Sequence, residues 1–215
     1  MLIKTVLFDL DGTLINTNDL IIASFLHTLD QYYPQKYTEK DIVEFIGEPL
    51  EVSFGRMESD EAKIGEMVGV YRKHNVAMHD ALVKEYPNVL TTIETLHSQG
   101  YKLGVVTTKR LDTVALGLKL SKLEPYFDVV VTIDDVVHAK PDPEPVLKAL
   151  KALNAQPSEA LMVGDSPSDI EAGKKAGTKT VAVGWSIKGA DLLRQSQPDY
   201  LIDDMKEMLE IVQTV

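Results

Sequence analysis

The chain has 215 residues, 44% of them hydrophobic and 26% charged, and a net charge of −11 at pH 7. This acidic balance disfavours nucleic-acid binding, which needs clustered lysine and arginine, but it allows an anionic substrate beside a bound cation. The chain has no cysteine, which excludes disulfides, thiolate metal sites and cysteine nucleophiles.

The first predicted element is a buried strand, TVLFDL at residues 5–10, at whose end stand two acids, Asp9 and Asp11. Side chains two positions apart on an extended strand point the same way, and Gly12 then allows a sharp turn. Burying even one unpaired carboxylate is expensive. The pair therefore indicates a site where a cation neutralises both acids.

Residues 16–82 contain no strand candidate. Helical patterns cover residues 18–33, 39–46 and 60–82, and Asn16 or Asn18 is the candidate cap of the first. An insertion of about 65 residues is too long for an ordinary strand-to-helix connection. We therefore expect a small all-helical domain at 16–82, above the carboxyl ends of the strands, and a core domain made of 1–15 and 83–215.

Beyond the insertion, short apolar runs alternate with helical patterns. The predicted strands are LGVVTT at 103–108, VVVTI at 129–133, LMVGD at 161–165 and TVAVG at 180–184. The predicted helices cover 88–99, 111–123, 144–154 and 168–177. This alternation is typical of an α/β fold with a doubly wound parallel sheet.

Polar side chains stand at or just beyond the ends of several of these strands. They are Asp9, Asp11, Thr107, Thr108, Lys109, Lys140, Asp165 and Asp169. Ligands of open α/β sheets bind outside the carboxyl ends of the strands, so we expect these groups to converge on one crevice. Carboxylates gathered there would repel one another unless a cation joined them. Ligation by oxygen alone points to Mg²⁺.

Four pieces in order carry a resemblance to a known family: DLDGT, the strand ending at Thr107, Lys140 followed by Pro141, and GDSPSD. Together they resemble the haloacid dehalogenase (HAD) superfamily of phosphohydrolases, in particular members with a helical cap. The resemblance implies a HAD-like Rossmannoid core, Mg²⁺ as cofactor and an aspartyl-phosphate intermediate.

Longer stretches, among them AKPDPEPV and TKTVAVGWSIKG, are similar to the bacterial inorganic pyrophosphatases of this superfamily. That similarity implies Mg²⁺-dependent hydrolysis of inorganic pyrophosphate to two phosphates. Phosphoglycolate phosphatase, or another small-molecule phosphomonoesterase of the superfamily, is the main alternative. A phosphomutase and a phosphoacceptor signalling domain are further alternatives, although a signalling domain needs no cap and no Asp11.

The resemblance also implies roles for individual residues. Asp9 would be the nucleophile and Asp11 the general acid and base. The metal would be held by Asp9, the backbone carbonyl of Asp11 and Asp165, with Asp169 orienting a water on the metal. Asp169 has a second interpretation, as an acid that favours a helix N-terminus.

The remaining candidates would bind the substrate. The Thr107 hydroxyl and the Thr108 amide would hydrogen-bond the phosphoryl group, and Lys140 would neutralise both the nucleophile and the phosphate. The candidates for the distal phosphate are Lys109, Arg110 and Arg56, each of which could instead be a solvated surface charge.

Features of the amino terminus and of the whole chain suggest a cytoplasmic protein. The first apolar stretch is interrupted by Lys4 and ends at Asp9, unlike a signal peptide. No apolar run approaches the roughly 18 residues of a membrane span. We expect a small inorganic or phosphorylated substrate as the partner, with no nucleic acid, no membrane and no stable protein partner.

Overall fold

The computed structural model describes residues 2–214 and divides them into two compact units. The first unit combines the residues up to Asn16 with those from Glu85 onward, and the second is Thr17–Lys84. The chain passes between the units through a two-stranded sheet of β2 (Ile15–Asn16) and β3 (Lys84–Glu85). The boundaries predicted from the sequence lie after residues 15 and 82.

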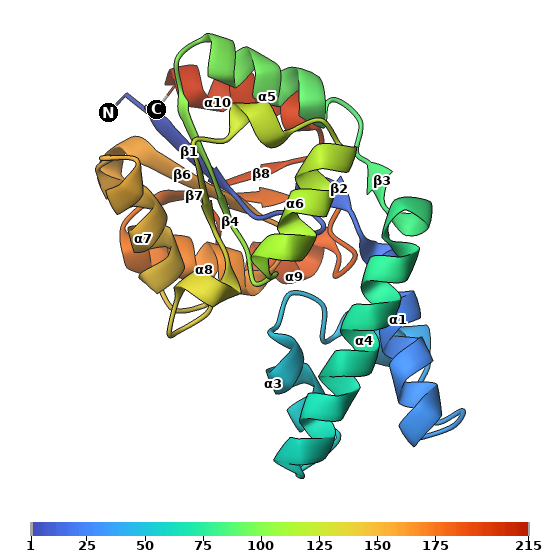
Figure 1. Cartoon of the computed structure of the whole chain (residues 1–215). Coiled ribbons are helices and arrows are strands. Elements are labelled where there is room, and N and C mark those ends of the chain that lie inside the picture. Colours follow the sequence, from blue (N-terminus) through green and yellow to red (C-terminus); the bar gives the residue numbers. More distant parts are fainter. Residues whose placement is uncertain (1, 215) are drawn as a thin grey trace. The chain divides into compact units, whose positions relative to one another are not determined.

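A six-stranded sheet forms the centre of the first unit (Figure 1), in the order β5-β4-β1-β6-β7-β8. Its strands are β1 (Thr5–Phe8), β4 (Lys102–Val106), β5 (Val129–Val131), β6 (Ala160–Gly164), β7 (Lys179–Val183) and β8 (Tyr200–Ile202). All neighbouring strands in this sheet pair in parallel. The predicted parallel α/β sheet is therefore confirmed. The edge strand β8 was not predicted, because its apolar run YLI is only three residues long and stands between Asp199 and Asp203, whereas β5 lies in the longer run VVVTI.

Helices cover both faces of this sheet (Figure 1). Helices α7 (Glu144–Ala152) and α8 (Pro167–Ala176) pack on one face, and α5 (Val89–Ser98) and α10 (Met208–Thr214) lie on the other. The unit also contains α6 (Leu111–Leu120), α9 (Ala190–Gln195) and the short 3₁₀ turns η1 (Glu124–Tyr126), η2 (Ile133–Asp135), η3 (Pro157–Glu159) and η4 (Met205–Glu207). Helix α6 ends before the predicted residue 123, because Lys122 takes a left-handed conformation with φ of 59°.

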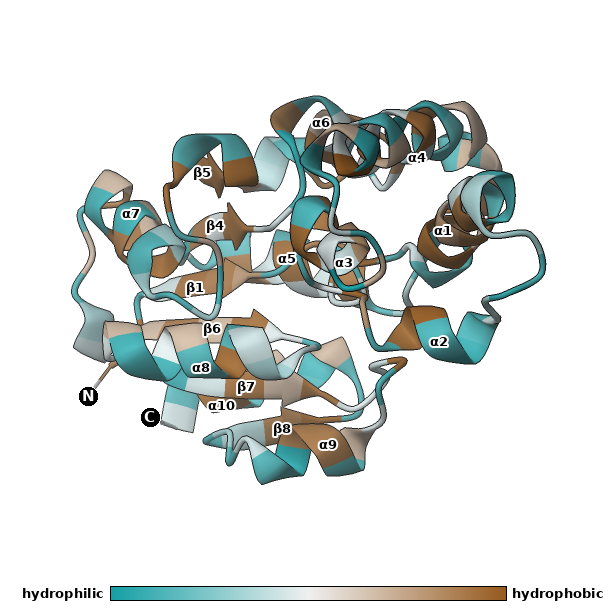
Figure 2. Cartoon of the chain, turned by 90° about the horizontal axis from the view of Figure 1, so that it is seen from below, coloured by the Kyte–Doolittle hydropathy of each residue, from teal (hydrophilic) through white to brown (hydrophobic). Residues whose placement is uncertain are grey.

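The core of this unit follows from the spacing of apolar residues. In α7, Val146, Ala149 and Leu150 recur at helical spacing and, with the C-cap residue Leu153, are buried against the strands. The strands carry near-continuous apolar runs because both of their faces are covered. Figure 2 shows hydrophobic colour along the strands, whereas the helices carry both colours. This packing makes the sheet a rigid support for groups at its carboxyl edge.

The second unit consists of helices. They are α1 (Asn18–Tyr32), α2 (Glu39–Val43), α3 (Leu50–Gly55) and α4 (Glu61–Leu82). Its core contains an aromatic cluster in which the Phe25 ring lies 5.2 Å from Phe54 and 4.9 Å from Tyr71, centroid to centroid. Helix α3 was not predicted.

The predicted cap of the first helix is wrong. The N-cap residue of α1 is Thr17, because Asn16 belongs to strand β2 and Asn18 is already helical. Among residues 2–214, no helix combines the length and the hydropathy that crossing a membrane requires.

Candidate active site

The carboxyl ends of three neighbouring strands bring the predicted site residues together. In the sheet register Phe8 lies opposite Val105 on one side and Val163 on the other. Asp9, Thr107 and Asp165 directly follow the last residues of β1, β4 and β6. The three side chains therefore lie at the same edge of the sheet. Convergence here follows from parallel pairing, which places all carboxyl ends on the same side.

Lys140 is the centre of a buried hydrogen-bond network at this edge. Its Nζ donates to Asp9 Oδ1 and to the Val106 carbonyl, each at 2.8 Å, and lies 2.6 Å from Asp169 Oδ1. The Lys140 side chain is only 3% exposed. One ammonium group therefore joins the ends of β1 and β4 to the first turn of α8.

Three carboxylates surround this lysine. Asp9, Asp165 and Asp169 are all buried, and each offers an oxygen within 4.8 Å of the others. Gly12 makes room for one of them: its φ is +78°, and a Cβ atom there would lie 2.3 Å from Asp165 Oδ2. Glycine is required at this turn both for the backbone conformation and for the close approach of the carboxylate.

The charges of this cluster are not balanced within the chain. Burial raises the pKa of Asp9 to about 7, although Lys140 acts in the opposite direction. Burial, together with Asp169 and Asp9, also raises the pKa of Asp165 well above its ordinary value. Burial alone would lower the pKa of Lys140, but the attraction of Asp169 and Asp9 outweighs burial and raises it. Three acids around one ammonium group leave an excess of negative charge.

The donor set fits a hard divalent cation. Asp169 Oδ2 already accepts from the Ser166 amide at 3.0 Å and the Ser166 hydroxyl at 2.6 Å, in the capping box of α8. Within residues 2–214, no hydrogen bond reaches Asp9 Oδ2 or the Asp165 carboxylate. Carboxylate oxygens of this kind suit Mg²⁺, so Asp9 and Asp165 are the residues that would hold it.

Metal binding should therefore stabilise the protein. At a Mg²⁺ concentration about 100 times the dissociation constant, binding contributes about 2.7 kcal/mol, and the midpoint of thermal unfolding should rise by roughly 5–10 °C. A chelator should reverse the rise, which differential scanning calorimetry measures. Asp165→Asn should abolish it, whereas Asp191→Asn, at a carboxylate that is 94% exposed, should not. An equal rise in the Asp165 variant would contradict the assignment.

Asp11 stands apart from the three clustered carboxylates. Its Oδ1 accepts from Lys109 Nζ at 2.7 Å, and both side chains are largely buried. The Lys109 backbone amide also donates to Thr107 Oγ1 at 3.2 Å. The predicted acid and base, Asp11, is thus placed beside two predicted substrate-binding residues. Thr108 is half-buried next to them.

Each of the two predicted arginines pairs with an acid of its own unit. Arg110 is exposed, and its Nε lies 3.5 Å from Asp134 Oδ1. Arg56 belongs to the helical unit, where it pairs with Glu48 at 2.5 Å. Their roles in substrate binding stay predictions.

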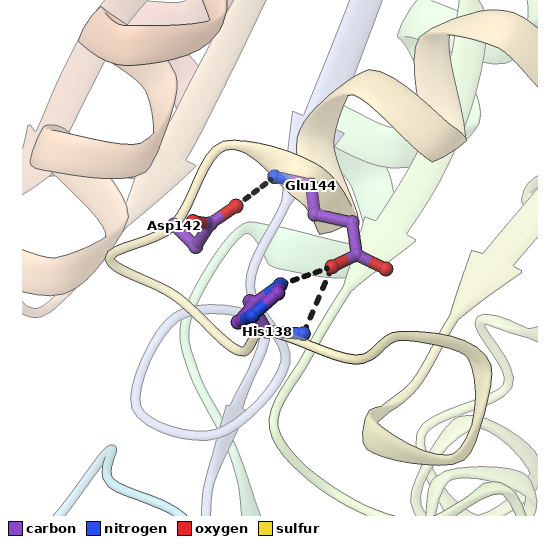
Figure 3. Close-up of side chains that lie close together, drawn as sticks. All are labelled: His138, Asp142 and Glu144. Carbon is purple, nitrogen blue, oxygen red and sulfur yellow. Dashed lines mark hydrogen bonds and ion pairs between the residues drawn. The ribbon is translucent and has the colours of Figure 1, made fainter.

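Glu144 holds the loop that carries Lys140, and sequence reasoning missed it (Figure 3). Its Oε1 accepts from the Val137 amide at 2.9 Å and its Oε2 from the His138 amide at 2.8 Å. The Glu144 amide in turn donates to Asp142 Oδ1 at 2.9 Å. The bonds from the Val137 and His138 amides lower the pKa of Glu144 and occupy its carboxylate with backbone donors. We therefore interpret this group as a brace for the loop, not as a metal site.

Ser186 is a second residue that sequence reasoning missed. Its hydroxyl donates to the backbone carbonyl of Asp165 at 2.6 Å, and its side chain is buried. The only sequence signal was its place directly beyond a predicted strand end. Trp185 beside it packs against Tyr86, with ring centroids 5.7 Å apart.

The fold and the buried acid–lysine cluster at its strand ends define a class of hydrolase. Residues 6–183 match the family model described as haloacid dehalogenase-like hydrolase, and the chain belongs to this family. It is 56% identical over 212 residues, covering 99% of this chain and 98% of the relative, to Pyrophosphatase PpaX of Anoxybacillus flavithermus. The resemblance found in the sequence is thereby confirmed.

Solved structures agree with this family. A haloacid dehalogenase-like family hydrolase from Streptococcus pneumoniae is 28% identical, with a TM-score of 0.86, and the match covers 97% of this chain and 98% of that one. A structure from Haemophilus somnus, described as a predicted phosphoglycolate phosphatase, is also 28% identical, with a TM-score of 0.84 and 97% coverage of both chains. The HAD-like fold is therefore shown along nearly the whole length.

Proposed function

We propose that this enzyme hydrolyses inorganic pyrophosphate to two phosphates, with Mg²⁺ as cofactor and Asp9 as the covalent nucleophile. The observation that carries the substrate is the 56% identity, over almost all of both chains, to Pyrophosphatase PpaX. The observation that supports the chemistry is the buried contact of Asp9 with Lys140 at the carboxyl edge of the sheet.

In the first step, an oxygen of Asp9 attacks phosphorus while the bond to the bridging oxygen breaks. Asp11 donates a proton to the departing phosphate, and an aspartyl phosphate remains. Lys140 holds Asp9 Oδ1 at 2.8 Å, which fixes the rotation of the carboxylate and offsets the charge of the phosphoryl group. A Mg²⁺ ion held by Asp9, Asp165 and the Asp11 carbonyl would stabilise that charge further.

In the second step, water attacks the aspartyl phosphate. Asp11, now ionised, accepts a proton from this water, the phosphorus–oxygen bond to Asp9 breaks, and the second phosphate leaves. The Thr107 hydroxyl and Thr108 amide are proposed to donate to the phosphoryl oxygens in both steps. We further propose that the helical unit Thr17–Lys84 serves as a cap that excludes bulk water during the reaction.

A substrate panel tests this function. Phosphate release is measured from pyrophosphate, phosphoglycolate, p-nitrophenyl phosphate and a hexose phosphate, each with Mg²⁺ and with a chelator. We expect the highest kcat/KM for pyrophosphate and loss of activity in the chelator. Much faster cleavage of phosphoglycolate than of pyrophosphate would instead favour the second candidate function, that of a phosphoglycolate phosphatase. The similarity to the Haemophilus somnus structure, at 28% identity, is the observation that suggests this alternative.

A further inference from the structure

The loop that follows β7 is fixed against the acid cluster. Gly164 of β6 lies opposite Ala182 of β7, so the chain leaves the sheet beside Asp165. Ser186 in this loop donates to the Asp165 carbonyl at 2.6 Å and accepts from the Lys188 amide at 3.2 Å. The backbone of Lys188 is therefore held two hydrogen bonds away from a predicted metal ligand.

Lys188 differs from the two other lysines at this edge in having no carboxylate partner. Lys140 is paired with Asp9 and Asp169, and Lys109 with Asp11. Lys188 is half-buried, and within residues 2–214 no ion pair involves its ammonium group.

The electrostatics of Asp165 show which way the Lys188 charge acts. Burial is the main cause of the raised pKa of Asp165, and Asp169 and Asp9 raise it further. Two cations, Lys140 and Lys188, act in the opposite direction and lower the pKa of Asp165. The hydrogen bonds through Ser186 hold the Lys188 backbone beside Asp165, and within residues 2–214 no carboxylate pairs with its ammonium group, which leaves that group able to bind an anion.

The chemistry of pyrophosphate requires such a cation. Its leaving group is itself a phosphate with several negative charges, whereas a phenol or alcohol leaving group carries at most one. The transferred phosphoryl group already has Lys140 beside the nucleophile. A lysine binds a phosphate as a compact point charge.

We propose that Lys188 binds the second, departing phosphate of pyrophosphate, an inference that rests on the proposed function. Lys188 thereby favours substrates whose leaving group is an anion over those whose leaving group is an alcohol or a phenol. Ser186 is the positioning residue that holds the loop in place.

Kinetics of Lys188→Ala and Lys188→Arg on two substrates test the proposal. For Lys188→Ala we expect kcat/KM on pyrophosphate to fall about 10- to 100-fold, mainly through KM. On p-nitrophenyl phosphate, the change should be less than about threefold. Lys188→Arg should recover most of the loss, because its charge is kept. Lys119→Ala, at an exposed lysine in the last turn of α6, is the matched control and should behave like the wild type on both substrates.

A binding measurement separates this role from a general effect on the acid cluster. Calorimetry with Mg²⁺ compares methylenediphosphonate with methylphosphonate, which lacks the second anionic group. Lys188→Ala should weaken only the first ligand by about 10- to 100-fold. An equal loss for both ligands, an equal fall on both substrates, or no loss at all would overturn the proposal. Thermal unfolding and circular dichroism of each variant establish that it is folded.

The two proposals fail in different ways. If the wild type does not hydrolyse pyrophosphate, the proposed function is wrong, whatever Lys188 does. If the wild type prefers pyrophosphate but Lys188→Ala shows no selective loss, only the assignment of Lys188 is wrong.

Discussion

Asp9→Asn is expected to lower kcat on pyrophosphate by about 10,000-fold or more, because no other group can take the place of the nucleophile. The amide oxygen is a poor nucleophile, and the covalent intermediate cannot form. Phosphate release under saturating substrate and Mg²⁺ measures the effect. Acid-quenched enzyme, examined by mass spectrometry, should carry no phosphoryl group.

Two comparisons show whether this loss is chemical or structural. The variant should unfold at close to the wild-type temperature without metal, since Lys140 keeps its contacts with Asp169 and the Val106 carbonyl. Asp191→Asn, at an exposed carboxylate, should keep wild-type activity. Retention of more than about a tenth of the activity by Asp9→Asn would remove Asp9 from the role of nucleophile.

Asp11→Asn is expected to lower kcat by about 100- to 10,000-fold, because loss of general acid–base catalysis affects both steps. Formation and hydrolysis of the aspartyl phosphate need not be slowed to the same extent. If attack by water becomes the slower one, phosphoenzyme accumulates, and rapid acid quench followed by mass spectrometry detects it.

The ion pair of Asp11 with Lys109 requires its own control. Lys109→Met removes the 2.7 Å contact but leaves the carboxylate, so it should cost far less in kcat than Asp11→Asn. Activity of Asp11→Asn within about threefold of the wild type would show that proton transfer does not pass through this residue. If kcat falls as much in Lys109→Met as in Asp11→Asn, the ion pair is essential for activity, and the effect of Asp11→Asn does not identify Asp11 as the acid and base.

The accuracy of the sequence-based predictions depended on the length of each apolar pattern. Strands and helices with long apolar patterns, such as β6 and α7, were predicted within a few residues. The strand β8 and the helices α3, α9 and α10 were missed, since each offers only a short apolar pattern. The predicted caps Asn16 and Asn18 were wrong because the N-cap lies one residue from each of them, at Thr17, whose side chain makes no capping hydrogen bond.

The site was predictable only in part. Parallel strands end on one side of their sheet, so acids at those ends had to lie near one another. The resemblance implied the contact of Lys140 with Asp9, but not those of Lys140 with Asp169 or of Lys109 with Asp11, which depend on distances in space. Residues that support the site, Glu144 and Ser186, act through bonds to backbone atoms, which leave no pattern in side-chain chemistry.

The sequence by itself determined the class of fold, the ordered acids and lysine of the family, and the need for a cation among them. These properties depend on local periodicity and on charge, which can be read along the chain. The tertiary structure alone decided that Lys109 pairs with Asp11, that Arg110 pairs with Asp134, and that no carboxylate within residues 2–214 pairs with Lys188. Pairing between charges depends on distances in space, and only the packed sheet and its loops set those distances.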